Sequence, residues 1–524
     1  MADFENIRAM ADITRRQAVA MPEAIAHVFE ERETSFRDLD AHANRVAQGL
    51  IEEGCRKDSR IGFMGKGSDL YFEMLHGAFK MGGVVVGVNW RLAPPEVSYV
   101  LNDSHTEILF VGAEFYDTAA KVLAECPNVR KVIALDGGRS DWISFDEWRD
   151  GFPPKDPMLA AEPDDDVIQL YTSGTTGHPK GVQLTNRNYM SAFRQFSDPQ
   201  TGLAKWEQGE VNLVCMPLFH VAGVNMGVLG NVNGCKNIIT KDVNPQEILR
   251  FIEHYRINLA LMVPAVILFV LQQPDVKERD FSSLRQVLYG ASPIAEDLLK
   301  QAKATFDCDM IQLYGLTETT GLASNLQPEE HDPARNRLRS CGKPNSGIEI
   351  RTVDENGKDI GVRQVGEIVI RSQCVMKGYW NRPEATAEAI QDGWFHTGDA
   401  GYFDEEGFLY IHDRVKDMIV SGAENIYPAE VENALFGHPA IADVAVIGVP
   451  DAQWGEAVKS IVVLKPGATV TASEIIAWAR DKIAGYKVPK SVDFIDALPR
   501  NPSGKILRRE LREPYWAGHD RRVG

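Results

Sequence analysis

The segment from Tyr171 to Val182, YTSGTTGHPKGV, carries the residue types that bind a polyanion. Glycines let a backbone turn through positive φ and come close to a ligand. Successive backbone N–H groups in such a loop form a concavity that suits phosphate oxygens, and hydroxyls and a lysine add donors and charge. The segment follows an apolar run and predicts a strand that leads into a phosphate-binding loop. Its candidate contacts are Thr172, Ser173, Gly174, Thr175, Thr176, Gly177 and Lys180.

This interpretation has one alternative, and one familiar motif is excluded. Gly, Ser and Thr are also ordinary residues of flexible surface loops. The spacing is not that of a P-loop, which needs a lysine directly after glycine and a hydroxyl directly after the lysine; here Lys180 lies between Pro179 and Gly181. The composition therefore favours a nucleotide-binding loop of another kind.

Polar residues follow three further predicted strands. His220 ends the run MPLFH and is either a buried core residue or part of a site. Gly290, Ala291 and Ser292 follow Val287–Tyr289, and the run YGLTET places Thr317 and Glu318 after another strand. A hydroxyl and a carboxylate at a strand end suit a nucleotide and Mg²⁺, although threonine also caps helices.

Two candidates lie closer to the C-terminus. Asp399, in GWFHTGD, could accept hydrogen bonds from ribose hydroxyls or could belong to a solvated turn. Lys505 is presented by the Gly/Pro-rich loop PRNPSGKI.

The whole composition limits the function classes. A net charge of −18 argues against nucleic acid as a partner. The seven cysteines are dispersed without a C-x-x-C pair, which fits neither a zinc site nor a disulfide framework and favours a reducing cytoplasm. The N-terminus lacks the apolar region of a secretory signal. No apolar run reaches the roughly 18 residues of a membrane span, so no span is predicted; peripheral membrane contact stays open, and so does a homodimer.

The order of the expected strands and helices predicts an α/β protein of several domains. With 524 residues the chain is too long for a single core. A strand over Arg60–Met64, a helix over Ser68–Met81 and a strand over Val84–Val88 form a βαβ unit, which implies a parallel sheet covered by helices. Short strands and turns from about Gly347 predict a small antiparallel or barrel-like subdomain. A charged segment at 411–417 precedes a last α+β module.

Six motifs in order resemble those of the adenylate-forming superfamily of acyl-CoA synthetases, luciferases and adenylation domains. Within this superfamily the chain looks like a bacterial medium- or long-chain fatty-acyl-CoA ligase. The resemblance covers nearly the whole length. The motifs are YTSGTTGHPKGV, PLFHVAG, YGLTET, WFHTGD, DRVKDMIVSGAENIYPAEVE and NPSGKIL. The resemblance implies an adenylation domain over 1–413, a hinge over 414–417 and a mobile C-terminal domain over 418–524.

The resemblance also implies a role for each candidate residue. The loop from Thr172 to Lys180 would hold the β- and γ-phosphates of ATP, Thr317 the α-phosphate and Glu318 Mg²⁺. Asp399 and Arg414 would hold the ribose, and adenine would lie against Gly290, Ala291, Ser292, Tyr314 and Gly315. Lys505 would reach the carboxylate and the α-phosphate, and His220 would gate the acid site. The C-terminal domain would rotate about Lys416.

The remaining residues implied by the resemblance concern CoA and the acid. The candidate CoA contacts are Arg91, Gly422, Ala423, Glu424, Trp454, Tyr486 and Lys490. The candidate acyl-pocket residues are Val224, Gly227, Val263 and Leu322, which are small or apolar. We therefore expect a ligase that uses ATP, Mg²⁺ and CoA to activate a fatty acid. The alternatives are an aryl or cyclic apolar acid, and delivery of the acyl group to a carrier protein.

Overall fold

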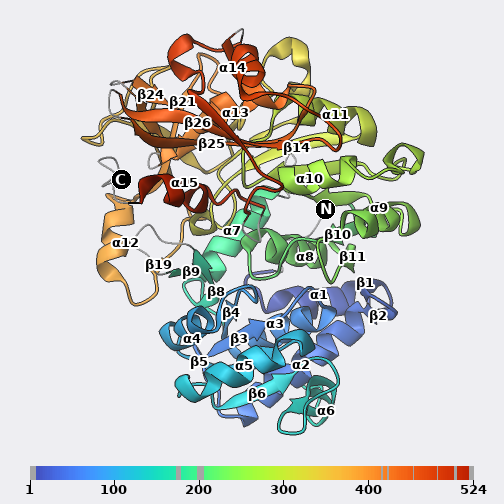
Figure 1. Cartoon of the computed structure of the whole chain (residues 1–524). Coiled ribbons are helices and arrows are strands. Elements are labelled where there is room, and N and C mark those ends of the chain that lie inside the picture. Colours follow the sequence, from blue (N-terminus) through green and yellow to red (C-terminus); the bar gives the residue numbers. More distant parts are fainter. Residues whose placement is uncertain are drawn as a thin grey trace.

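The computed structural model describes residues 7–172, 179–196, 206–414, 417–421, 424–451, 454–480, 482–500 and 504–517, with the side chains of 412–414 and 424–425 excepted. The chain forms four sheets with helices packed against them, and the C-terminal part lies against the middle of the chain (Figure 1). The fold is mixed α/β, as predicted. Among the described residues, no helix is both long and apolar enough to span a membrane.

The first large sheet has eight strands in the order β19-β9-β8-β4-β3-β5-β6-β7. The strands from β8 to β7 are parallel, whereas β9 and β19 join one edge antiparallel. The predicted βαβ unit is present as β3, α3 and β4. The elements are β3 (Arg60–Met64), α3 (Asp69–Met81), β4 (Val84–Gly87), β5 (Thr106–Val111), β6 (Lys131–Ala134), β7 (Ile143–Ser144), β8 (Asp166–Thr172), β9 (Lys180–Thr185) and β19 (Gly378–Tyr379).

The second large sheet has nine strands in the order β16-β15-β14-β13-β12-β10-β11-β1-β2. Its middle, from β14 to β1, is parallel, so the carboxyl ends of these strands share one edge. The strands are β1 (Ile25–Phe29), β2 (Arg32–Ser35), β10 (Val211–Val214), β11 (Lys236–Ile239), β12 (Leu259–Leu261), β13 (Gln286–Gly290), β14 (Asp309–Tyr314), β15 (Ser324–Leu326) and β16 (Lys343–Pro344).

Helices link and cover these strands. The apolar run Leu259–Leu271 is divided into β12 and a helix, because Pro264 stands at the first helical position, where its missing N–H costs nothing. The helices used below are α7 (Asn186–Phe196), α8 (Val221–Asn233), α9 (Pro245–His254), α10 (Pro264–Leu271) and α11 (Glu296–Phe306).

The region after Gly347 forms a small antiparallel sheet, β17-β18-β21-β20, with β22 paired to β21. The predicted turn signals at Gly357 and Gly407 both take positive φ. The strands are β17 (Glu349–Val353), β18 (Gly366–Arg371), β20 (Ile390–Gln391), β21 (Trp394–Phe403) and β22 (Leu409–Arg414).

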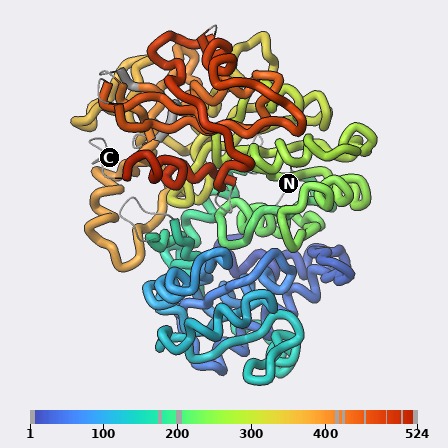
Figure 2. The backbone as a smooth tube through the Cα atoms, viewed as in Figure 1, coloured from blue at the N-terminus to red at the C-terminus, as the bar shows by residue number. Residues whose placement is uncertain are grey.

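The last sheet belongs to the C-terminal module and has the order β24-β23-β26-β25, with β27 beside β26. Its own apolar cluster includes Ile419, Val431, Val446 and Ile475. The chain runs through this module in orange and red at the top of the molecule (Figure 2). The elements are β23 (Ile419–Ser421), β24 (Glu424–Ile426), α13 (Pro428–Phe436), β25 (Ile441–Asp451), β26 (Gly455–Leu464), α14 (Ala472–Arg480), β27 (Ser491–Phe494) and α15 (Arg508–Trp516).

Candidate active site

The predicted phosphate loop connects two paired strands. β8 ends at Thr172, β9 begins at Lys180, and these two residues face each other in the antiparallel register. The Lys180 ammonium lies 5.0 Å from the centre of the Tyr379 ring. Ser173, Gly174, Thr175, Thr176 and Gly177 lie outside the described residues. Phosphate binding by this loop therefore stays a prediction, with Thr172 and Lys180 fixed at its two ends.

Glu318 lies beside Thr172, where this loop begins. The Thr172 hydroxyl donates to its Oε1 atom over 3.2 Å, and the Tyr379 hydroxyl donates to the same atom over 3.1 Å. The Glu318 residue is buried, and its backbone carbonyl accepts from the Met376 N–H over 2.7 Å. Two donors on one oxygen orient the carboxylate, so that its other oxygen is available to a cation.

Tyr379 is a functional candidate that the sequence did not reveal. It lies on β19, which pairs with β9 through Tyr379 and Val182. Burial and then the charge of Glu318 hold the pKa of its hydroxyl well above the usual range. The hydroxyl therefore keeps its proton and acts as a donor. The only sequence signal is a Gly-Tyr-Trp run in a segment that joins the edge of a distant strand.

Thr317 begins a short 3₁₀ turn, Thr317–Thr319. The cap position belongs to Leu316, whose N–H donates to the Thr319 hydroxyl over 2.9 Å. The alternative in which Thr317 serves as a helix cap is therefore not realised. Gly315 just before the turn has no room for a side chain, because a Cβ there would lie 2.4 Å from the carbonyl carbon of Gly321.

The predicted adenine and ribose residues meet at the ends of neighbouring strands. Gly290 ends β13 and pairs with Leu313 of β14. A Cβ atom at Gly290 would lie 2.2 Å from the Leu313 carbonyl oxygen, and Ala291 then takes a φ of 66°. Such a conformation is uncommon for a residue with a side chain and marks functional sites. Ser292 follows and is partly buried.

Asp399 is tied to the second large sheet. Its Oδ2 atom accepts from the Tyr314 hydroxyl over 2.8 Å, and its N–H donates to the Thr397 hydroxyl over 3.0 Å. Burial and then Asp399 raise the pKa of Tyr314 well above its usual value. Asp399 faces Arg414 in the register of β21 and β22. The Arg414 side chain is outside the described part of the chain.

His220 stands at the N-cap of α8, and its side chain makes no cap hydrogen bond. Among the described residues, its Nε2 atom has no hydrogen-bond partner although it is buried. Burial, followed by the positive charges of Lys505 and Arg91, lowers the pKa of His220 to about 4. The imidazole is therefore neutral at neutral pH.

The Lys505 loop lies on the large domain. A Cβ at Gly504 would lie 3.0 Å from the Val263 Cγ2 and 3.2 Å from the Ala265 Cβ, at the start of α10. The φ of Gly504 is 79°, which only glycine adopts without strain. Glycine therefore permits this close approach, and the charge of Lys505 reaches His220.

Arg91 lies on the same side of the site. Its guanidinium covers the Trp90 ring at 4.4 Å, and Trp90 meets Phe219 edge to face at 6.3 Å between ring centres. Its positive charge contributes to the lowered pKa of His220. Arg91 is thus near the predicted acid site as well as being a candidate CoA contact.

The other candidate CoA contacts lie on the C-terminal module. Trp454 and Tyr486 are 45% and 44% exposed, and Lys490, which follows Tyr486 closely in the chain, is exposed as well. Within the described ranges, no hydrogen bond, ion pair or ring contact joins Arg91 to these three residues. Gly422, Ala423 and Lys416 lie outside those ranges, as does the Glu424 side chain.

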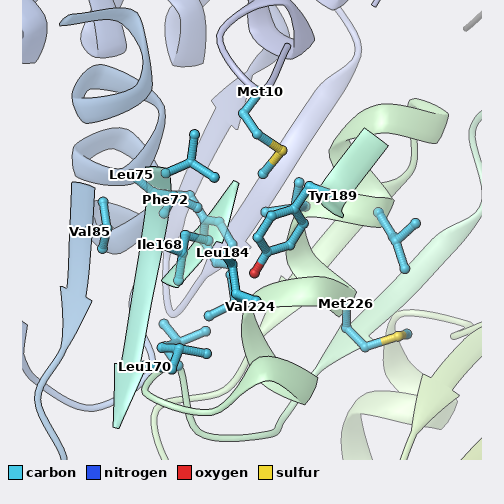
Figure 3. Close-up of a cluster of buried hydrophobic side chains, with 14 of the residues drawn as sticks. Met10, Phe72, Leu75, Val85, Ile168, Leu170, Leu184, Tyr189, Val224 and Met226 are labelled. Carbon is cyan, nitrogen blue, oxygen red and sulfur yellow. The ribbon is translucent and has the colours of Figure 1, made fainter. Parts of the chain in front are cut away.

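The candidate acyl-pocket residues come from α8 and its neighbours. Val224 and Leu322 are fully buried in one apolar cluster, where Val224 lies near Tyr189 and Leu170 (Figure 3). Gly227 leaves room for Phe72, whose Cζ would be 2.2 Å from a Cβ at that position. Val263 belongs to a second cluster, beside Gly504.

Comparisons with known proteins give consistent results over the whole chain. The family described as AMP-binding enzyme matches residues 14–380, and the AMP-binding enzyme C-terminal domain matches 430–505. A fatty acid–[acyl-carrier-protein] ligase from Streptomyces coeruleorubidus is 38% identical over 99% of this chain and 98% of that protein. A feruloyl-CoA synthase from Amycolatopsis sp. is 37% identical, with 95% and 98% covered. A long-chain-fatty-acid–CoA ligase from Mycobacterium tuberculosis is 36% identical, with 96% and 98% covered.

Solved structures agree in fold. An anthranilate CoA ligase in complex with anthranoyl-AMP superimposes with a TM-score of 0.91 at 26% identity, covering 97% of this chain and 98% of the other. A Mycobacterium tuberculosis fatty acyl CoA synthetase gives a TM-score of 0.77 at 33% identity, covering 98% and 100%. The resemblance to the adenylate-forming superfamily and to its fatty-acyl-CoA ligases is thus confirmed.

Proposed function

The chain belongs to the AMP-binding enzyme family, and we propose that it is an ATP-dependent acid:CoA ligase that forms an acyl-adenylate from a medium- or long-chain fatty acid. The observation that carries the proposal is the docking of the Lys505 loop on Val263 and Ala265. That contact lies on the domain that carries Glu318 and Asp399, and it supports a role for Lys505 in adenylation.

In the first half-reaction the carboxylate oxygen attacks the α-phosphorus of ATP, the new O–P bond forms, and the bond to pyrophosphate breaks. Two anions must approach, so catalysis consists mainly of positioning and charge stabilisation. Lys505 neutralises the attacking carboxylate and the α-phosphate, and Thr317 donates to that phosphate. Lys180 and the preceding loop hold the departing pyrophosphate.

Mg²⁺ fits the residues around Glu318. No group of three or more candidate metal ligands occurs among the described residues. Mg²⁺ is commonly held by one or two carboxylates together with substrate phosphates, and the donors from Thr172 and Tyr379 orient the single carboxylate of Glu318. When bound, the ion would offset the phosphate charge.

In the second half-reaction the thiol attacks the acyl carbonyl, the C–S bond forms and AMP leaves. A thiol needs only modest help to lose its proton, and His220, neutral and buried, serves as a gate and not as an obligatory base. Among the described residues, Trp454, Tyr486 and Lys490 make no hydrogen bond, ion pair or ring contact with Arg91. We infer that the module rotates about Lys416 between the half-reactions and exchanges Lys505 for the loop 421–427.

The acid is proposed to be apolar. The candidate walls Val224, Val263 and Leu322 are buried and apolar, and they offer no cation for a second carboxylate. A fatty acid is favoured because two of the relatives are named for fatty acids. An aryl acid is the second candidate, because the feruloyl-CoA synthase is about as similar.

Delivery to a carrier protein is a second candidate function. The AMP-binding enzyme family models do not distinguish CoA from a carrier protein as the acceptor. The relative from Streptomyces coeruleorubidus is named for a carrier-protein substrate and has a similar length. The choice between the two acceptors therefore depends on the acceptor assay.

An acid panel with two thiol acceptors tests the proposal. The panel contains medium- and long-chain fatty acids, ferulic acid and indoleacetic acid. AMP release is measured for each acid with CoA, with a pantetheinylated carrier protein, and with neither acceptor. We expect acyl-CoA from a fatty acid. Acyl-adenylate that forms without any acyl-CoA would refute the proposed acceptor, and exclusive use of ferulic or indoleacetic acid would refute the proposed acid.

A further inference from the structure

Helix α11 of the large domain has no cap of its own. Its N-cap residue is Ala295, which has no side-chain acceptor. The first helical N–H, that of Glu296, donates instead to the Oδ1 of Asn433 over 3.1 Å. Asn433 lies on α13 of the C-terminal module, so a helix in one domain is capped by a side chain from the other.

Two further contacts surround this cap. Phe436, three residues after Asn433 and thus on the same face of α13, packs against the large-domain cluster that contains Val263 and Ala265. Gly437 caps the C-terminus of α13 and lies close to Asp297 of α11. A Cβ atom at Gly437 would lie 2.7 Å from the Asp297 Oδ2 atom. α13 therefore sits on the start of α11 while the Gly504 loop sits on the start of α10.

We propose that Asn433 is a positioning residue, which holds the C-terminal module in the orientation that presents Lys505 and releases it when the module rotates. The proposal rests on the proposed two-step function. An amide oxygen on an open helix N–H contributes a modest free energy, and water replaces it once the domains part. Such a contact can bias the orientation of the module without locking it.

Three variants isolate this role. Asn433→Ala removes the interdomain cap. Asn244→Ala is the matched control, because Asn244 caps α9 within the large domain by accepting from Gln246 and Glu247. Ala295→Ser in the Asn433→Ala background gives α11 a cap of its own, since Ala295 already has the extended backbone that an N-cap requires.

The first readout compares the two half-reactions with dodecanoic acid as probe, or with ferulic acid where the panel selects it. We expect Asn433→Ala to slow acid-dependent ATP–pyrophosphate exchange about threefold to tenfold. Thioester formation from supplied acyl-adenylate should stay at the wild-type rate. Asn244→Ala should leave the ratio of the two rates unchanged. Ala295→Ser should restore thermal stability to the Asn433→Ala protein but not the ratio.

The second readout needs no turnover and separates this proposal from the proposed function. Hydrogen exchange of the Glu296 N–H, read from a peptide that begins well before Glu296, is followed in the ligand-free protein. Faster exchange in Asn433→Ala and wild-type exchange in Asn244→Ala support the cap even if neither acid is a substrate. Unchanged exchange, or recovery of the rate ratio by Ala295→Ser, overturns the positioning role, because the effect would then be absent or would reflect only the stability of α11.

Discussion

The Tyr314 hydroxyl donates to the Oδ2 atom of Asp399 over 2.8 Å, and this bond joins the last residue of β14 to the middle of β21. The two strands belong to different sheets. The bond thus fixes a carboxylate proposed to hold the ribose against a tyrosine proposed to line the adenine site.

The first prediction concerns this bond. Tyr314→Phe should raise the KM for ATP about tenfold, because a hydrogen bond to a charged group is lost. The KM for CoA should not change, since the CoA candidates lie on other elements. Initial rates at varied ATP and varied CoA provide the measurement. Equal increases in both KM values would place Tyr314 outside the nucleotide site.

The second prediction separates the two half-reactions. Lys505→Ala should lower ATP–pyrophosphate exchange about a hundredfold or more, because one preorganised charge is removed from the transition state. Transfer from supplied acyl-adenylate to CoA should persist near the wild-type rate. Lys490→Ala is the matched control on the same module and should raise only the KM for CoA. Parallel loss of both half-reactions in Lys505→Ala would contradict the rotation of the module.

The third prediction compares Glu318 with its donor Tyr379. Glu318→Gln should lower adenylation about a hundredfold, because it removes the proposed ligand of Mg²⁺. Tyr379→Phe should cost about tenfold and should raise the Mg²⁺ concentration needed for half-maximal rate, since the carboxylate loses one of its two orienting bonds. Mg²⁺ titrations of both variants test this. A Tyr379→Phe protein with wild-type Mg²⁺ dependence would refute the positioning role.

The fourth prediction concerns acid stability. His331 donates from Nδ1 to the Gln327 carbonyl, so its Nε2 accepts from the Tyr289 hydroxyl and the ring is neutral. Burial lowers the pKa of His331 from 6.5 to about 4. The unfolded chain therefore takes up a proton first as the pH falls. His331 contributes stability that is complete above pH 6.5 and is lost as the pH falls towards about 4.

His331→Gln should reduce the loss of stability over this window by about 1.4 kcal/mol per pH unit. Apparent melting temperatures of variant and wild type at several pH values measure the difference. A constant difference across the window would mean that His331 takes up its proton equally in both states.

The sequence predicted the strands that end at the site because their apolar runs stop at glycines and polar residues, as at Gly290 and Thr317. It did not predict Tyr379, because β19 has only two residues and pairs with a strand far away in the sequence. β25 and β26 stay paired up to the end where the chain passes from one to the other, because Pro450 faces Glu456 and Asp451 faces Gly455.

The contacts between the two domains could not be predicted from the sequence either. Asn433 is an ordinary helical residue by its local pattern, and only the docking of α13 places its amide at Glu296. Whether Lys505 lies near His220 depends on the orientation of two domains, which no local pattern encodes. Residue types and positions marked Thr172, Glu318 and Asp399 as candidates, and the resemblance gave each a role. The hydrogen bonds from Thr172 to Glu318 and from Tyr314 to Asp399 came from the structure.

The attack of the carboxylate on the α-phosphorus is the central claim, and isotope transfer tests it most directly. The enzyme is supplied with ATP, CoA and an acid labelled with ¹⁸O at both carboxylate oxygens, and the products are analysed by mass spectrometry. We predict AMP that carries one ¹⁸O atom, unlabelled pyrophosphate and a thioester that keeps the other label. Formation of ADP, or label in orthophosphate in place of AMP, would contradict the account.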